Sequence, residues 1–405
     1  MNSISHRQST RVIGNDNSPP PGETGTELSI VMPCLNEGAT LRACVEKAQQ
    51  ALREHHIVGE IIVADNGSTD GSQEIAKRLG ARLVNVEKKG YGNALMGGIM
   101  AARGKYVLMG DADGSYDFAH APRFLEKLRQ GYDLVLGNRF DGGIAASAMP
   151  RSHRYFGNPA LTCVSRLFFH CPTGDIYCGL RGFSRDAILR MDLRTTGMEF
   201  AVEMVVKATL MGLRVGEVPT TLSPDGRTRP PHLQTWLDGW RTIRFMLLYS
   251  PRWLFFYPGV LLILFGLAVD LWLFPGPRTV GSVTFDAHTF LYAAMAILIG
   301  FQAICFGLFA RTFAVTEGLL PEDALLNVFF RTFTLETGLV IGAVLVAGGL
   351  AGSVFAVNAW RLRDFGPLDF SRTLRIVIPA ATAITLGFQT VLSSFLVSLL
   401  GLARR

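Results

Sequence analysis

The first half of the chain alternates short apolar runs with stretches in which apolar residues recur at helical spacing. The expected strands are 28–32, 60–65, 82–86, 105–109, 133–137 and 214–218. The expected helices are 41–52, 73–79, 90–102, 118–130 and 199–210, the last of them amphipathic. Strands that alternate with helices at this spacing predict an α/β fold with a largely parallel sheet.

The last third of the chain contains apolar runs long enough to cross a lipid bilayer. Four spans are expected, near 254–274, 290–310, 337–359 and 376–402. Pro258 and Asp270 make the first run the least regular. An even number of spans returns the C-terminus to the side of the N-terminal domain, and the Arg-rich approach at 227–252 favours the cytoplasm for that side. One loop disagrees, because four arginines would then lie on the outer side: Arg361, Arg363, Arg372 and Arg375.

Residues 231–252 join the two halves and carry two tryptophans in an apolar stripe that Arg241 and Arg244 flank. This pattern favours an amphipathic helix at the membrane interface over an ordinary surface helix. Residues 1–26 are polar and lack periodicity, so a disordered tail is expected there. The predicted domains are the tail 1–26, an α/β domain 27–230, the interfacial helix 231–252 and a transmembrane domain 253–405.

Composition narrows the class of protein. The 405 residues are 49% hydrophobic and 18% charged, with a net charge of +6. No zinc-finger spacing or ladder of basic and aromatic residues supports nucleic-acid binding. The six cysteines form no Cys-x-x-Cys pair, which indicates reduced thiols. The first apolar run, 28–32, is too short for a signal peptide, so the α/β domain is expected on the cytoplasmic face.

Two carboxylates, Asp111 and Asp113, directly follow the apolar run 105–109. Ligands of open α/β sheets bind beyond the carboxyl ends of the strands. Two carboxylates one residue apart can share a Mg²⁺ or Mn²⁺ ion with the phosphates of a substrate. The alternative is a pair of ordinary turn aspartates. The glycines Gly90 and Gly92 resemble part of a dinucleotide fingerprint, but they follow the third strand and the third glycine is missing. A nicotinamide site is therefore rejected, although backbone N–H groups at that helix start could contact an anion.

Three motifs in order carry a resemblance to a known family. They are Val-Met-Pro-Cys-Leu-Asn-Glu at 31–37, Ile-Val-Ala-Asp-Asn-Gly-Ser-Thr-Asp-Gly at 62–71, and Asp-Ala-Asp at 111–113. Residues 28–250 resemble family 2 glycosyltransferases of the GT-A fold, especially polyprenyl-phosphate sugar synthases of the dolichyl-phosphate mannose or glucose synthase type. Each motif alone is weak, but together, at the family's spacing, they are specific.

The resemblance implies roles for individual residues. The catalytic residues would be Asp111, Asp113 and Arg139, and Asp111 and Asp113 would hold Mg²⁺ or Mn²⁺. Ser115 stands where the family often has a glutamine. The nucleotide sugar would contact Pro33, Asn36, Glu37, Asp65, Asn66, Gly92, Asp111, Ala112 and Asp113, with Asp65 facing the base. The acceptor phosphate would contact Arg139, Arg151, Arg227 and Arg229.

The implied reaction is an inverting transfer of a hexose, mannose or glucose, from a GDP- or UDP-linked sugar to a polyprenyl phosphate, undecaprenyl or dolichyl. The expected partners are therefore the nucleotide sugar, the polyprenyl phosphate and the lipid bilayer, and a homo-oligomer is left open. One alternative is another lipid or polysaccharide acceptor, although the Gln-x-x-Arg-Trp motif of processive relatives is absent. The other is a non-catalytic membrane scaffold or lipid transporter with a degenerate transferase domain, against which the intact Asp111 and Asp113 argue.

Overall fold

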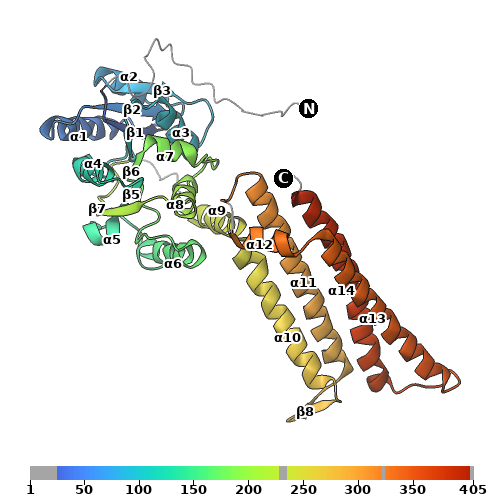
Figure 1. Cartoon of the computed structure of the whole chain (residues 1–405). Coiled ribbons are helices and arrows are strands. Elements are labelled where there is room, and N and C mark those ends of the chain that lie inside the picture. The colour runs from blue at the N-terminus through green and yellow to red at the C-terminus, as the bar shows by residue number, and fades with distance from the viewer. Residues whose placement is uncertain (1–24, 228–234, 322–323, 402–405) are drawn as a thin grey trace. The chain divides into compact units, whose positions relative to one another are not determined.

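The computed structural model describes residues 25–227, 235–321 and 324–401 (Figure 1). The chain divides into two compact units, Met1–Met246 and Leu247–Arg405, and each is considered by itself. Most of the predicted tail 1–26 lies outside the described residues, as does the segment 228–234 with Arg229.

The first unit is built on a mixed sheet with the strand order β3-β2-β1-β4-β6-β5-β7. The strands are β1 Leu28–Cys34, β2 Gly59–Asp65, β3 Arg82–Asn85, β4 Tyr106–Met109, β5 Leu134–Asn138, β6 Arg181–Ser184 and β7 Val215–Pro219. β6 runs antiparallel to both β4 and β5, and the other pairings are parallel. The predicted α/β, mostly parallel GT-A sheet is confirmed. β6 was not expected, because its four residues are too short to show a period.

Helices flank this sheet and connect its strands. They are α1 Leu41–Glu54, α2 Ser72–Arg78, α3 Tyr91–Ala101, α4 Ala121–Arg129, α5 Arg139–Gly142, α6 Asn158–Phe169, α7 Arg185–Arg190, α8 Phe200–Leu210 and α9 Thr235–Leu248. The apolar face predicted for α1 is its buried face. The amphipathic face predicted for α8 is wrong, because residues 200–208 are buried all round. Two charged residues of this helix, Glu203 and Lys207, pair with each other at 2.8 Å inside the unit.

The second unit consists mainly of long apolar helices, and four helical segments among its described residues are long and apolar enough to cross a membrane. The first is Arg252–Leu273, which includes α10 Tyr257–Leu273, and the others are α11 Ala287–Thr316, α13 Leu335–Arg361 and α14 Phe370–Gly401. The short α12 Ala324–Thr332 and the hairpin of β8 Arg278–Val280 and β9 Val283–Phe285 lie between them in the chain. The π-helical turn Arg252–Phe256 precedes α10. Pro258 lies in the first turn of α10, where a missing N–H costs little. The predicted transmembrane domain of four spans is confirmed.

Glycines hold these helices together in two pairs, which Figure 1 shows as α10 beside α11 and α13 beside α14. A Cβ added to Gly300 would lie 2.5 Å from the carbonyl oxygen of Gly259 across the first pair. A Cβ on Gly387 would lie 2.7 Å from the carbonyl oxygen of Gly342 across the second. Lipid offers no hydrophobic drive for helices to associate, so close backbone contact of this kind supplies much of the packing energy.

The two helix pairs are joined where α10 ends and α11 and α14 begin. Leu273, Phe290, Ala294 and Ile378 form a buried apolar cluster at this end. Arg375 pairs there with Asp286 and donates from Nε to the carbonyl oxygen of Leu273 at 2.9 Å. The arginine that complicated the prediction of topology is thus paired with a carboxylate inside its own unit.

Candidate active site

The motifs singled out in the sequence meet at one edge of the sheet. β1 pairs in parallel with β2 and β4, and β5 has the direction of β4 because the antiparallel β6 lies between them. Their carboxyl ends therefore share the edge at which open α/β sheets bind ligands. The structure brings residues 33–37, Asp65, Asn66, residues 111–113 and Arg139 to this edge.

The turn after β4 presents two carboxylates that are tightly supported. Asp113 is buried, and its Oδ1 accepts hydrogen bonds from the N–H and the hydroxyl of Ser115, at 2.9 and 2.6 Å. The hydroxyl of Tyr91 donates to Oδ1 of Asp111 at 3.0 Å. Burial, and after it the charge of Asp113, raise the pKa of Asp111. A cation bound beside the pair would favour the charged form of these carboxyl groups.

A cation from a distant part of the chain reaches this acidic turn. Nη2 of Arg227 lies 2.9 Å from Oε1 of Glu37 and 3.2 Å from Oδ2 of Asp113. The N–H of Gly226 donates to the carbonyl oxygen of Asp113 at 2.9 Å, which fixes the loop that carries the arginine. The structure thus places Arg227 between Glu37 and Asp113. The sequence had led us to expect Arg227 beside the acceptor phosphate and the two acidic residues beside the nucleotide sugar.

The acidic residues fit a hard divalent cation. Carboxylate oxygens are the ligands that Mg²⁺ and Mn²⁺ prefer. Glu37 and Asp113 already hold a guanidinium between them, so the position accommodates positive charge. Within the described part of the chain, no group of three or more His, Cys, Asp or Glu side chains could hold a metal ion by itself. A bound metal would therefore need ligands from a substrate, as Mg²⁺ usually does.

The loop after β1 is fastened to its neighbours on both sides. Asn36 has a left-handed backbone with φ 59°, and its Oδ1 accepts a hydrogen bond from the N–H of Thr69 at 2.8 Å. The hydroxyl of Thr40 donates to the carbonyl oxygen of Ala112 at 2.7 Å. Pro33 lies within β1 itself. These bonds join the three predicted motifs into one surface.

Asp65 and Asn66 use their side chains on the loops around them. The carboxylate of Asp65 accepts hydrogen bonds from the N–H of Gly67 at 2.9 Å and from the amide of Gln73 at 2.7 Å. Nδ2 of Asn66 donates to the carbonyl oxygen of Val86 at 2.9 Å. Both residues therefore fix the loops at this edge of the sheet, and their contact with a nucleotide stays a prediction.

Arg139 has a carboxylate partner that the sequence did not reveal. Its Nε and Nη2 donate to the two carboxylate oxygens of Asp175 at 2.6 and 2.7 Å, and Asp175 is completely buried. Arg139 is itself only 7% exposed. Two planar hydrogen bonds of this kind fix a guanidinium firmly. The fork expected to aim at an acceptor phosphate is thus occupied by Asp175, and Nη1 is the nitrogen left for any such contact.

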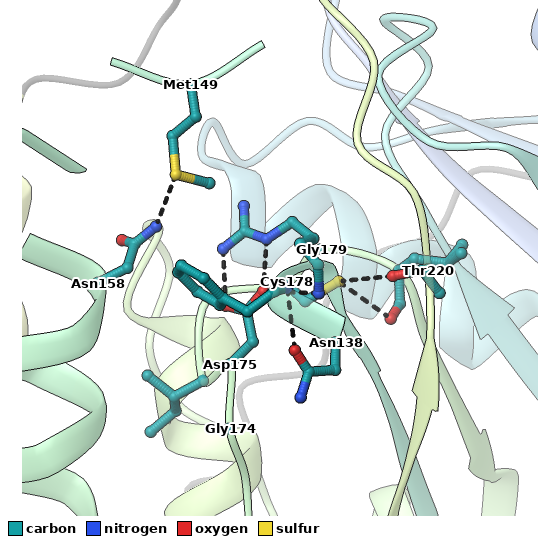
Figure 2. A network of polar contacts seen from close by, with 12 residues as sticks. Asn138, Met149, Asn158, Gly174, Asp175, Cys178, Gly179 and Thr220 are labelled. Atoms are coloured by element: carbon teal, nitrogen blue, oxygen red, sulfur yellow. Dashed lines mark hydrogen bonds and ion pairs between the residues drawn. The ribbon is translucent and has the colours of Figure 1, made fainter. Parts of the chain in front are cut away.

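The Arg139–Asp175 pair belongs to a wider polar network at the ends of β5 and β7 (Figure 2). The amide of Asn138 donates to Oε2 of Glu217 at 3.2 Å, and Oε1 of Glu217 accepts from the N–H of Gly174 at 2.6 Å. Asp175 follows Gly174 in an irregular segment without strand or helix period. No pattern in the sequence indicated this network, because its members are brought together only by the sheet.

The glycine pair before α3 serves close packing. The N–H of Gly92 donates to the carbonyl oxygen of Thr196 at 2.9 Å, so it is already used and is not a free donor for an anion. A Cβ on Gly90 would lie 2.4 Å from that same oxygen. The residue between the glycines, Tyr91, is the one that reaches Asp111. The position of Tyr91 between two glycines at the start of a helix was the feature of the sequence that could have indicated this contact.

The other two arginines predicted at the acceptor phosphate are Arg151 and Arg229. Arg151 is exposed on the helical turn that precedes the π-helical segment His153–Gly157. Arg229 lies outside the described residues. The structure therefore neither joins nor separates them from an acceptor phosphate, and their roles stay predictions.

Two family models match the chain. The model of glycosyl transferase family 2 matches residues 29–191, and that of the glycosyltransferase family 2 C-terminal transmembrane region matches residues 308–401. The second match covers α13, α14 and the end of α11, and together with the four apolar spans among the described residues it identifies an integral membrane protein.

Curated proteins and solved structures show similarity as well. The low-salt glycan biosynthesis hexosyltransferase Agl6 of Haloferax volcanii is 37% identical over 92% of this chain and 89% of its own length. The dolichyl-phosphate hexose transferase of the same organism is 28% identical over 48% of this chain and 82% of its own. A crystal structure of glucosyl-3-phosphoglycerate synthase from Mycobacterium tuberculosis has 24% identity and a TM-score of 0.44, over 56% of this chain and 80% of that one.

Proposed function

The chain belongs to glycosyltransferase family 2, and from that premise we propose that it transfers a hexose, mannose or glucose, from a GDP- or UDP-linked sugar to a polyprenyl phosphate at the cytoplasmic face of the membrane. The observation that carries the proposal is the acidic turn at the sheet edge. Asp111 and Asp113 follow β4 there, and the loop of Arg227 closes over them.

The donor side of the reaction needs charge neutralisation. A Mg²⁺ or Mn²⁺ ion held by Asp111 and Asp113 would offset the charge that develops on the departing nucleoside diphosphate. Tyr91 and Ser115 keep the two carboxylates oriented through the hydrogen bonds described above. Arg227 balances Glu37 and Asp113. Positioned charge of this kind is the main means by which an enzyme lowers such a barrier.

The acceptor side needs position more than proton transfer. A phosphate oxygen of the acceptor attacks the anomeric carbon of the hexose, and the bond from that carbon to the diphosphate breaks on the opposite face with inversion. Because a phosphate monoester is anionic at neutral pH, no general base has to remove a proton. The residues contribute by holding both reactants in line.

The membrane part and the relatives support a lipid acceptor. A polyprenyl chain stays in the bilayer, whereas nucleotide sugars are water-soluble, so the two substrates must meet at the membrane surface. On α9, Trp236 is 90% exposed and Trp240 is 58% exposed, which suits a helix at the interface. One relative, which matches about half of this chain, is named as a dolichyl-phosphate hexose transferase, and the longer-matching relative as a hexosyltransferase of glycan biosynthesis.

The test is a transfer assay with the full chain purified in detergent. Undecaprenyl and dolichyl phosphate are offered with a panel of labelled GDP- and UDP-sugars, in the presence of Mg²⁺, Mn²⁺ or a chelator. We expect label in the lipid from one donor, lost with the chelator. Absence of a lipid product from every donor, with the protein folded, would rule out this acceptor. Label in another lipid or a polysaccharide would indicate a different transferase, and no transfer at all a scaffold.

The cytoplasmic orientation can be tested with the protein's own cysteines. Cys163 is the exposed one of the six, and the other five are buried. A membrane-impermeant maleimide should label it in inside-out vesicles and not in intact cells. The variant Cys163→Ser gives the background signal. Labelling in intact cells would place the first unit on the outer face.

A further inference from the structure

A large cavity lies inside the membrane unit. Its volume is about 1250 Å³, which exceeds the roughly 300–1,000 Å³ of typical small-molecule pockets. Three helices form its walls: the second half of α11, the first turns of α13 and the last turns of α14. The short helix α12 and the turn after it complete the lining.

The two helix pairs are tied together by a buried cluster and an ion pair at the end of the unit opposite the cavity. The apolar cluster with Leu273 and the Asp286–Arg375 pair ties α11 to α14 where both begin. Within each pair, glycines keep the helices in contact along their length. Toward the ends of α11 and α14 the cavity lies between the pairs. Because α10 and α11 are antiparallel neighbours, the cavity lies at the end of the unit where α10 begins and α11 ends.

The walls of the cavity are apolar and its mouth is polar. Phe301, Ile304 and Leu308 of α11 face Ile341 and Leu345 of α13 across it. Of the four α14 hydroxyls in the lining, those of Thr390 and Ser394 donate to carbonyl oxygens of their own helix at 2.7 Å, and Ser393 and Ser398 are the other two. The charged residues of the lining are Arg331 and Glu336, and both belong to the segment where α12 gives way to α13.

We propose that this cavity binds the apolar chain of the polyprenyl phosphate, with the phosphate at the mouth beside Arg331. The inference rests on the proposed function for the identity of the lipid. A long apolar chain fits a large apolar space within the bilayer, and a phosphate matches an exposed arginine that has no acidic partner among the described residues. The cavity thereby holds the acceptor at the membrane face where the chain enters its first span.

The first test compares acceptors of different chain length. Ile341→Trp fills the cavity, and Val340→Trp is the matched control, because Val340 is exposed on the same helix but does not line the cavity. With Ile341→Trp we expect KM for undecaprenyl phosphate to rise at least roughly tenfold, the equivalent of about two CH₂ groups left unburied. KM for geranyl phosphate, whose chain is too short to fill the cavity, should stay at the wild-type value. Equal KM values for both variants with undecaprenyl phosphate would overturn the proposal.

The second test measures binding without catalysis. An undecaprenyl phosphate analogue with a photoreactive group at its far end should crosslink to α11, α13 or α14 of the full chain. Unlabelled undecaprenyl phosphate should compete, and phosphatidylglycerol should not. Equal competition by both lipids would make the cavity a general lipid site and contradict the proposal. Arg331→Gln should weaken crosslinking and Arg331→Lys retain it, whereas wild-type crosslinking in Arg331→Gln would remove the phosphate from this position.

The two tests separate this inference from the proposed function. If the wild type transfers sugar to both acceptors and Ile341→Trp behaves as Val340→Trp does, the function stands and the cavity proposal fails. If the wild type transfers to neither acceptor, the proposed function fails, and crosslinking outside α11, α13 and α14 would then remove the cavity proposal as well.

Discussion

The two units of the chain deal with buried polar groups in opposite ways. The first unit buries whole charged side chains: Arg139 with Asp175, Lys207 with Glu203, and Arg181 with backbone carbonyl groups. The membrane unit instead brings backbones together at glycines, and its Asp286–Arg375 pair lies at helix ends.

The difference follows from the surrounding solvent. In water, burial of apolar surface stabilises the first unit enough to offset the desolvation of a few charges. Those charges fix the irregular loops at the sheet edge, where the site is built. In a bilayer the helices gain nothing from burying apolar side chains, so close packing and few charges are the stable arrangement. Polar networks therefore support the candidate site in the first unit, whereas the membrane unit holds its helices together by close packing.

The largest effect should come from the acidic turn. Asp113→Asn keeps the size of the side chain but removes its charge, and we expect transfer to fall about 10²- to 10³-fold, as for loss of one catalytic charge-stabilising group. Mn²⁺ binding in the presence of donor, followed by electron paramagnetic resonance, should fall with it. Asp117→Asn is the matched control, because Asp117 caps the next helical turn on the surface. Wild-type transfer in Asp113→Asn would exclude the turn from the reaction.

Breaking a buried charge pair should come next. Asp175→Ala leaves the guanidinium of Arg139 buried without its carboxylate, and we expect the first unit to lose about 3–5 kcal/mol of stability. Thermal unfolding of the full chain in detergent, followed by near-ultraviolet circular dichroism, measures the change. The control is Asp192→Asn, which breaks an exposed pair with Arg194. The double variant Arg139→Met, Asp175→Leu should recover much of the lost stability, because it leaves no unpaired charge buried. If the double variant loses as much stability as Asp175→Ala, the unpaired charge is not the cause.

The membrane unit should be sensitive to side-chain size where its helices touch. Gly342→Leu inserts a side chain where a Cβ alone would lie 2.8 Å from the carbonyl oxygen of Gly387. Overpacking of this kind costs about 1–3 kcal/mol. Gly348→Leu on the same helix is the control, since a Cβ there meets nothing within 4 Å. Unfolding in mixed micelles should separate the two variants, and equal stability would argue against glycine packing.

The smallest effect should come from an exposed ion pair of the first unit. Arg129 donates two hydrogen bonds to the carboxylate of Glu27. These hydrogen bonds are the main reason why the pKa of Glu27 is lowered. A carboxylate whose pKa is lowered by folding stabilises the folded state at pH values above its pKa in the unfolded chain. This stabilisation is lost as the pH falls through its pKa in the folded state. Glu27→Gln should therefore cost less than about 1 kcal/mol at pH 7, and the cost should shrink as the pH falls below the usual glutamate pKa of 4.5. A loss as large as that of Asp175→Ala would show that burial is not what distinguishes the two pairs.

The sequence by itself determined the alternating strands and helices up to residue 137, the four spans and the acidic turn. These features are local, because apolar period and span length depend on residues close together in the chain. The motifs at 31–37, 62–71 and 111–113 were recognisable for the same reason, and parallel strands oblige their carboxyl ends to meet.

Only the tertiary structure decided which charges meet. Asp175 lies thirty-six residues from Arg139, and Arg227 lies further still from Glu37. Sequence period carries no information about such partners, so Arg139 was assigned to a phosphate although a carboxylate already occupies its fork. The burial of α8 was hidden likewise, since Glu203 and Lys207 neutralise each other inside the unit. The cavity between the helix pairs was equally beyond the sequence, because it arises from where the helices are joined and not from the composition of any one of them.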